Sequence, residues 1–293
     1  MRGLVLLCLV FVASVSASPF VEVQRGYHEE VGIPLFEQIK AYEENLPVTQ
    51  DGEERIVGGA VAPIGAHPHF AGLLINMVNA AGQSVCGSSL LSQNRLVTAA
   101  HCWFDGWNQA WMFTVILGSN FLMSGGTRIA TSQVIMHPQW NPSNLNNDVA
   151  MIYLPTNVLT TTTIRPIDIP NVSELLNTFT GQWAVAAGFG RTSDLQAGAS
   201  TVVSHVNLQV ISVAQCQATY GANFVQQSTL CTNGVGGVGV CSGDSGGPLS
   251  IYLNGRNVLI GISSFVAANG CQLGHPSAFA RVTSFRDFIQ QHI

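Results

Sequence analysis

The sequence predicts an all-β globular domain that follows a short acidic leader. From Ile56 onward, short apolar runs alternate with Gly, Asn, Ser and Pro, which is the spacing expected of a chain of short strands and turns. Helix signals are scarce in that region, and no internal repeat or low-complexity segment is present. These observations favour a strand-rich fold over a helical or mixed one.

The first 17 residues have the organisation of a secretory signal. Arg2 supplies a basic end, Leu4 to Ala13 is apolar, and Val15-Ser16-Ala17 offers a cleavage site of small residues. The apolar run is too short to span a bilayer. No other stretch approaches 18 apolar residues, so we expect a secreted, extracellular protein without a membrane partner.

Residues 18–55 carry most of the net negative charge. They hold nine acidic and three basic residues, whereas seven acids and seven arginines balance from Ile56 onward. An amphipathic pattern from Ile33 to Tyr42 favours a short helix within this leader. No basic cluster occurs anywhere, which argues against a nucleic-acid partner.

The strands and the last helix can be placed by their apolar patterns. Strands are expected over residues 71–75, 95–98, 114–117 and 258–262, each a compact apolar run. At the C-terminus, Ser284 is expected to cap a helix that buries Phe285, Phe288 and Ile289.

Six cysteines remain once Cys8 leaves with the signal segment. An even number in a secreted chain implies disulfides, and six cysteines permit fifteen pairings. Neither a C-x-x-C motif nor a pair of histidines at metal-ligand spacing is present, so a zinc site is disfavoured. The six are Cys86, Cys102, Cys216, Cys231, Cys241 and Cys271.

Three short motifs contain the residues of a nucleophilic catalytic centre. They are Thr98 to Cys102 around His101, Asn147 to Ala150 around Asp148, and Gly243 to Leu249 around Ser245. A serine hydroxyl attacks an amide at neutral pH only if a neutral imidazole takes its proton, and a buried carboxylate must fix the tautomer of that imidazole. The three motifs supply one of each group.

These motifs resemble those of the serine endopeptidases of the trypsin/chymotrypsin fold, and are most similar to the digestive chymotrypsin-like and elastase-like proteases of arthropods. The resemblance covers residues 56–293. It implies two antiparallel β-barrels, about 56–164 and 165–293, with the active site in the cleft between them. It also implies that His101 is the general base and acid, Asp148 its orienting carboxylate and Ser245 the nucleophile.

The same resemblance implies the oxyanion hole and the mode of activation. The backbone N–H groups of Gly243 and Ser245 would bind the oxyanion. A trypsin-like protease would cut after Arg55, in Arg55-Ile56-Val57-Gly58-Gly59, and the new ammonium of Ile56 would pair with Asp244. Residues 18–55 would then be an activation propeptide, released because no cysteine tethers it. The implied disulfides are Cys86–Cys102, Cys216–Cys231 and Cys241–Cys271.

The specificity pocket departs from that of the trypsins. Gly239 stands where a trypsin has Asp, so a substrate Lys or Arg would find no buried carboxylate. Val266 resembles the elastases and narrows the pocket. Together with Ser264, Phe265 and Ser277, these residues predict cleavage after uncharged apolar residues. Aromatic, Leu and small aliphatic residues remain alternatives.

Two other classes of function remain to be weighed, and both are disfavoured. A non-catalytic homologue would normally lack a triad residue, whereas a regulatory cascade protease would normally carry a disulfide-knotted clip domain. No acid lies between Gly106 and Asn147, so no calcium loop is expected, and the resemblance implies no other metal or cofactor. We expect a monomer whose partners are protein or peptide substrates, its activator and protein inhibitors. Asn171-Val172-Ser173 also matches a glycosylation acceptor sequence.

Overall fold

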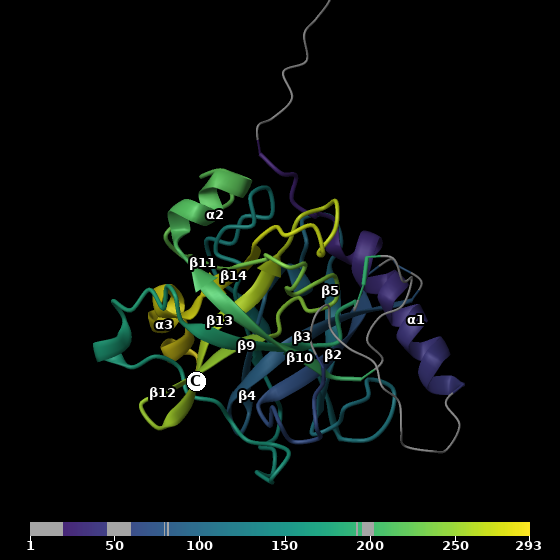
Figure 1. Ribbon diagram of the computed structural model, residues 1–293. Coiled ribbons are helices and arrows are strands. Elements are labelled where there is room, and N and C mark those ends of the chain that lie inside the picture. The colour runs from purple at the N-terminus through teal and green to yellow at the C-terminus, as the bar shows by residue number, and fades with distance from the viewer. Residues whose placement is uncertain (1–19, 46–59, 79, 81, 192, 195–201) are drawn as a thin grey trace, which may run out of the picture.

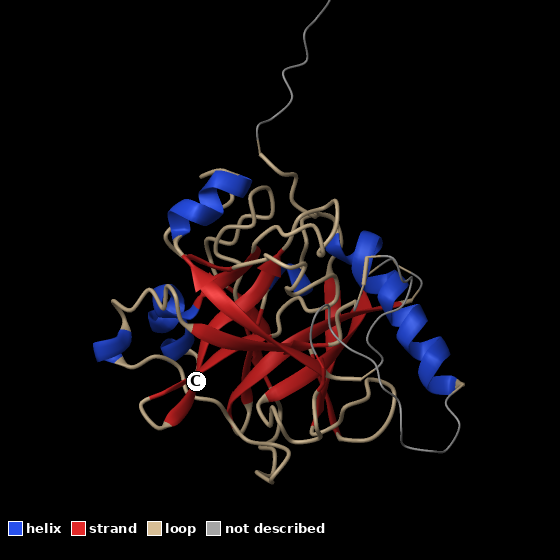
Figure 2. Cartoon of the chain, viewed as in Figure 1, coloured by secondary structure: helices blue, strands red, loops and turns tan. Residues whose placement is uncertain are grey.

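Two antiparallel β-sheets make up most of the computed structural model, with short helices at the periphery (Figures 1 and 2). The structure describes residues 20–45, 60–78, 80, 82–191, 193–194 and 202–293. Each sheet has seven strands within this part of the chain. The predicted all-β architecture of two barrels and a short C-terminal helix is confirmed. No helix among the described residues is long and apolar enough to cross a membrane.

The N-terminal sheet has the strand order β6-β5-β2-β3-β4-β8-β7. Its members are β2 (Phe70–Met77), β3 (Gln83–Ser92), β4 (Arg95–Thr98), β5 (Ala110–Leu117), β6 (Thr127–Thr131), β7 (Val134–Met136) and β8 (Ala150–Tyr153). The side chains of Leu73, Phe113 and Met151 lie in its fully buried core.

The C-terminal sheet closes on itself. Its order is β1-β10-β11-β14-β13-β12-β9, and β9 also pairs with β10. Its members are β1 (Ala60–Val61), β9 (Trp183–Gly188), β10 (Ser204–Ile211), β11 (Thr229–Thr232), β12 (Pro248–Leu253), β13 (Arg256–Phe265) and β14 (Ser277–Arg281). Along β10, Val206, Leu208 and Val210 alternate into the core with more exposed polar residues between them, as a half-buried strand requires.

Strand β1 joins the second sheet although it precedes the first in sequence. Ala60 pairs with His205 and Val61 with Ser204, both in β10. The chain after residue 59 is therefore fixed to the C-terminal barrel before it enters β2.

The C-terminal helix begins earlier than the sequence predicted. Helix α3 spans Val282–Gln291 with Arg281 at the N-cap position, so Ser284 lies inside the helix and the predicted cap is wrong. The physical reason is burial, because Val282 is fully buried and continues the path of β14 directly into the helix. Phe285 and Ile289 are buried as expected, whereas Phe288 is only partly buried.

Helix α2, Val213–Tyr220, was not predicted. Its start is marked by a capping box: Ser212 Oγ accepts from the Gln215 N–H, and the Gln215 side chain accepts from the Ser212 N–H. The Ser-x-x-Gln pattern was visible in the sequence. Two short 3₁₀ turns, η2 (Ala100–Cys102) and η3 (Val172–Glu174), are the other helical segments described after residue 60.

The leader forms a helix, as its amphipathic pattern predicted. A π-helical turn, η1 (His28–Gly32), continues into α1 (Ile33–Glu44), which lies beside β3 at the edge of the molecule (Figure 1). Tyr27, Val31, Leu35 and Ile39 follow one another at intervals of four residues, and all four are buried. Residues 27–39 of the leader are thus packed onto the barrels.

Three disulfides connect the pairs that the resemblance implied. They are Cys86–Cys102, Cys216–Cys231 and Cys241–Cys271. The first ties β3 to the turn that carries His101, and the third ties the segment before Ser245 to the loop after β13.

Candidate active site

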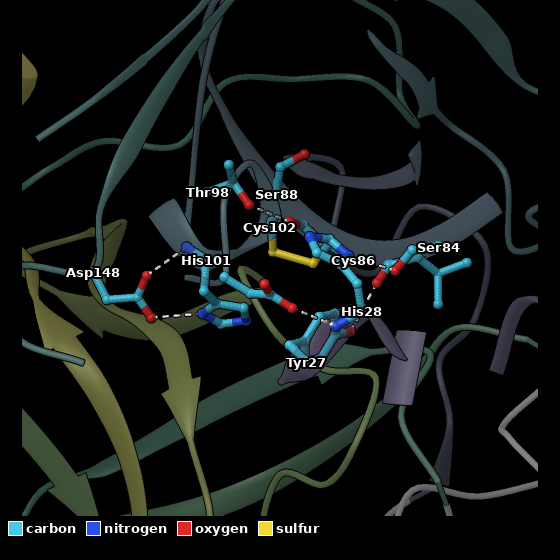
Figure 3. The surroundings of a disulfide bond; sticks show 12 residues. Tyr27, His28, Ser84, Cys86, Ser88, Thr98, His101, Cys102 and Asp148 are labelled. Atoms are coloured by element: carbon cyan, nitrogen blue, oxygen red, sulfur yellow. Dashed lines mark hydrogen bonds and ion pairs between the residues drawn. A yellow bond between two sulfur atoms is a disulfide. The ribbon is translucent and has the colours of Figure 1, made fainter. Parts of the chain in front are cut away.

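His101 and Asp148 form a doubly hydrogen-bonded pair between the end of β4 and the start of β8 (Figure 3). The Nδ1 atom of His101 lies 2.7 Å from Asp148 Oδ2, and the backbone N–H of His101 donates to Asp148 Oδ1 at 2.9 Å. Both side chains are buried, with 4% and 1% of their surface exposed. The imidazole is therefore held in one orientation relative to the carboxylate.

Ser264 supplies a further donor to the same carboxylate. Its hydroxyl donates to Asp148 Oδ2 at 2.6 Å. A buried carboxylate is costly unless hydrogen bonds satisfy it, and three donors do so here. When Nδ1 carries the proton and donates to Asp148, Nε2 is left as the acceptor of the neutral ring. Nε2 of His101 is buried and has no hydrogen-bond partner among the described residues.

Ser245 lies in a tight turn that leads into β12. Its carbonyl accepts a hydrogen bond from the Gly87 N–H of β3 at 2.7 Å, which connects the two barrels at this point. Gly243 and Gly246 have φ values of +105° and +75°. A Cβ on Gly246 would collide with Thr98 Oγ1, so both the conformation and the close approach require glycine.

The structure brings most of the expected pocket residues together. Ser264, Phe265 and Val266 line one cavity with His101 and Ser245. Gly239 and Ser277 do not line this cavity. They lie next to each other beside its wall, because a Cβ on Gly239 would be 2.7 Å from Ser277 Oγ, and that hydroxyl accepts from the Val240 N–H.

Asp244 is buried in the turn between Gly243 and Ser245. Its two carboxylate oxygens accept from the N–H groups of Gly190 and Cys241 at 2.8 and 2.9 Å. Burial raises the pKa of Asp244 to about 6, although these hydrogen bonds lower it. No ion pair among the described residues includes Asp244. Arg55 and Ile56 lie outside the described residues.

The structure adds residues that the sequence analysis did not connect with the site. The ring centroid of Tyr27 in the leader lies 4.8 Å from that of His101 (Figure 3). Gln24, Arg25 and Gly26 line the same cavity as Ser245. The spacing of Tyr27, Val31, Leu35 and Ile39 was a readable sign of a buried helical face, but nothing in the sequence indicated which surface it covers.

Two groups of His, Cys and Asp side chains lie close enough together to suggest a metal site, but their chemistry does not suit one. Cys86, His101 and Cys102 lie close together, as do Asp194, Cys241 and Cys271. All four cysteines are in disulfides, and a metal requires the thiolate form of the ligand.

Comparisons with known proteins agree with this geometry. The trypsin family model matches residues 56–289, and the chain belongs to the trypsin family of serine endopeptidases. It is 36% identical to a collagenase from Hypoderma lineatum over 86% of this chain and 92% of the relative. It is 37% identical to brachyurin from Leptuca pugilator over 80% of this chain and 97% of that protein. A solved collagenase structure covers 80% of this chain and 97% of its own, with a TM-score of 0.73 at 36% identity. The resemblance to arthropod chymotrypsin-like proteases is confirmed.

Proposed function

We propose that this protein is a secreted serine endopeptidase, made as an inactive zymogen, that cleaves peptide bonds after uncharged apolar residues. The observation that carries the proposal is the buried His101–Asp148 pair, whose Nε2 atom is unbonded and shares one cavity with Ser245. Residues 1–17 are the signal, and 18–55 are the activation propeptide.

The proposed chemistry follows from these positions. Ser245 Oγ attacks the substrate carbonyl while its proton passes to His101 Nε2, and Asp148 stabilises the resulting imidazolium. The oxyanion accepts hydrogen bonds from the N–H groups of Gly243 and Ser245. The intermediate collapses as the imidazolium returns its proton to the leaving amine, which gives an acyl-enzyme. Water then attacks the acyl-enzyme while His101 takes its proton. The imidazolium returns that proton to Ser245 Oγ, which releases the acid product and restores the serine.

A fluorophosphonate probe tests the nucleophile directly. After a trypsin-like protease has cut the chain at Arg55 and the leader has been removed, the probe should form a covalent adduct on Ser245, located by peptide mass spectrometry. The uncut zymogen should react much more slowly. An adduct confined to other residues, or none at all, would contradict the proposal.

The pocket prediction concerns Val266, which lines the cavity and packs against the Cys241–Cys271 disulfide. Changing Val266 to Gly should widen the pocket. The kcat/KM for cleavage after large aromatic residues should then rise relative to cleavage after Leu or Ala, by the equivalent of about 1 to 3 kcal/mol, the usual scale for pocket shape. The measurement is a panel of peptide substrates that differ in one residue. Val172→Gly, at an exposed position in η3, serves as the control. Efficient cleavage after Arg or Lys by the wild type would refute the assignment of Gly239.

The activation prediction concerns Asp244. In the cleaved enzyme, Asp244→Asn should lower kcat by about 10² to 10³, the scale of one misplaced oxyanion donor, because an amide cannot pair with the Ile56 ammonium. Steady-state kinetics after complete cleavage at Arg55 would measure this. An unchanged kcat would show that the ammonium does not act through Asp244.

In the uncut zymogen, the same Asp244→Asn substitution should raise the free energy of unfolding relative to wild type as pH increases. Burial raises the pKa of Asp244 to about 6, so its favourable contribution to the free energy of unfolding is complete below the unfolded value of about 4 and is lost as pH rises through about 6. Asn does not titrate. Denaturant unfolding should therefore show Asp244→Asn gaining stability relative to wild type between pH 4 and 6, and parallel curves would rule this out.

A digestive role is proposed on the similarity to arthropod proteases. Two of the relatives are named collagenase or brachyurin, so denatured and native collagen belong in the panel of protein substrates. A regulatory protease would instead cut one or a few of the proteins offered. A non-catalytic homologue would fail the fluorophosphonate test.

A further inference from the structure

The leader occupies the cleft that the proposed function assigns to the substrate. Val23 forms an antiparallel bridge with Ala267, directly after the pocket residue Val266. The Gln24 N–H donates to the Val266 carbonyl at 3.2 Å, and the Ala268 N–H donates to the Glu22 carbonyl at 2.9 Å. Residues 22–24 of the leader thus pair through their backbone with residues 266–268, and such pairing is a general way for proteins to bind extended peptides.

Tyr27 fills the space beside the catalytic imidazole. The chain turns at Gly26, where φ is +64°, and the Tyr27 hydroxyl donates to the Val85 carbonyl at 2.7 Å. Its ring is buried against His101 (Figure 3). A side chain therefore lies where a scissile peptide group would have to approach His101.

The segment after Tyr27 is fixed by polar contacts and is helical. The His28 N–H donates to Asp105 Oδ2 at 3.0 Å, and His28 Nδ1 lies 2.8 Å from Ser84 Oγ. The backbone of η1 and α1 follows at once, with its hydrogen bonds made inside the helix. A protease acts on an extended chain, so this arrangement holds the leader in the cleft in a form that resists cleavage.

Helix α1 attaches the leader through a buried apolar face. Leu35, Phe36 and Ile39 are each less than 10% exposed and belong to one cluster with residues of both barrels. Leu35 also touches Gly243, which the proposed function assigns to the oxyanion hole, because a Cβ placed on Gly243 would collide with Leu35 Cδ2. The barrel residues of the cluster include Phe70, Leu74, Val85, Ile116, Leu122 and Phe189.

The far end of α1 is held by a carboxylate. Glu43 accepts from the N–H groups of Leu122 and Met123 at 2.8 to 3.1 Å. The next residue, Glu44, is exposed. The two neighbouring glutamates therefore provide a matched pair, one in contact with the barrel and one in solvent.

None of these contacts depends on the bond between Arg55 and Ile56. We propose that residues 20–45 are an active-site inhibitor of this protease, and that they remain bound in the substrate cleft after that bond is cut. This inference rests on the proposed function, and it identifies the occupant of the cleft as the protein's own acidic leader. Activation would then need two events, the cut at Arg55 and the departure of the leader.

The first experiment uses the full chain. The zymogen is cut at Arg55, and mass spectrometry verifies that the leader is intact, since Arg25 and Lys40 are also potential tryptic sites. The leader should co-elute with the protease domain in gel filtration, and the rate of fluorophosphonate labelling per molecule should rise on dilution. Tyr27→Ala zymogen, cut in the same way, should label rapidly without dilution.

The second experiment adds a synthetic peptide of residues 20–45 to the cleaved, leader-free enzyme. The peptide should slow labelling of Ser245 and compete with substrate. Tyr27→Ala and Leu35→Asp peptides should have inhibition constants at least about tenfold higher, as expected for buried residues at the centre of an interface. Glu43→Gln should weaken inhibition, whereas Glu44→Gln should leave it unchanged.

The outcomes separate this inference from the proposed function. The inference alone is overturned if labelling of the cut enzyme does not rise on dilution and the leader-free enzyme labels at Ser245 but is not slowed by the peptide. Leader-free enzyme that never labels overturns the proposed function. If the peptide is too weakly helical to bind by itself, the dilution experiment decides, because there the leader starts in its folded position.

Discussion

Replacing Ser245 with Ala is expected to lower kcat of the cleaved enzyme by about 10⁶ and to abolish fluorophosphonate labelling, because the reaction loses the hydroxyl that attacks the substrate. The side chain is only partly buried and its backbone carbonyl makes the structural contact with Gly87, so folding and cleavage at Arg55 should be unaffected. Steady-state kinetics and labelling would measure the loss.

The control for this variant is Ser250→Ala in β12, a buried serine outside the catalytic cavity. It should label and turn over at rates close to the wild type. A Ser245→Ala enzyme that retained more than about a thousandth of wild-type kcat would place the nucleophile elsewhere, since binding and oxyanion stabilisation alone give far less.

Replacing Asp148 with Asn should lower kcat by about 10⁴ at neutral pH. The substituted side chain would present an amide to His101, and the ring would be pushed toward the tautomer with its proton on Nε2, which cannot accept the proton of Ser245. The Ser264 hydroxyl and the His101 N–H would also lose a charged acceptor. Kinetics across a pH range, with folding checked by thermal unfolding, would measure the effect.

The matched control is Asp168→Asn, because the Asp168 side chain is 61% exposed and pairs only with Arg256 at the surface among the described residues. Exposed ion pairs contribute little, so its kcat should be unchanged. A double variant of Asp148→Asn with Ser245→Ala should be no slower than Ser245→Ala alone, since the two residues act in one step. A further multiplicative loss in the double variant would mean that Asp148 acts independently of the serine.

Local patterns were enough to predict the all-β class and several strands, because those strands are compact apolar runs bounded by turn residues, whereas the two barrels were implied by the family resemblance. The run 95–98 coincides with β4, and the run 258–262 lies inside β13. The proposed triad residues could be predicted because the chemistry requires rare neighbours, such as glycines at positive φ around Ser245. Their geometry could not be predicted. The Ser264–Asp148 hydrogen bond joins residues of different barrels, and no local pattern encodes it.

The leader shows where sequence reasoning stopped. Its helix was predicted from the pattern between Ile33 and Tyr42, but its position was not, because Tyr27 and His101 meet only through the tertiary fold. The lack of a cysteine suggested a peptide that leaves after cleavage. In the uncleaved chain, the stripe of residues from Tyr27 to Ile39 is buried and belongs to the packed core.

The position of β1 limits how far the new terminus can travel. Ala60 is four residues after Ile56, a span of at most about 14 Å when fully extended. Val61 pairs with Ser204, Ser204 also pairs with Gly188, and a Cβ on Gly188 would touch the Asp244 carboxylate. Gly188, which neighbours the Asp244 carboxylate, is therefore two strand spacings, or about 10 Å, from β1. The proposed cut at Arg55 would therefore create an ammonium on a short tether, at an effective concentration of about millimolar or more around Asp244. Its insertion would be intramolecular, so the speed of that step should not depend on how dilute the enzyme is.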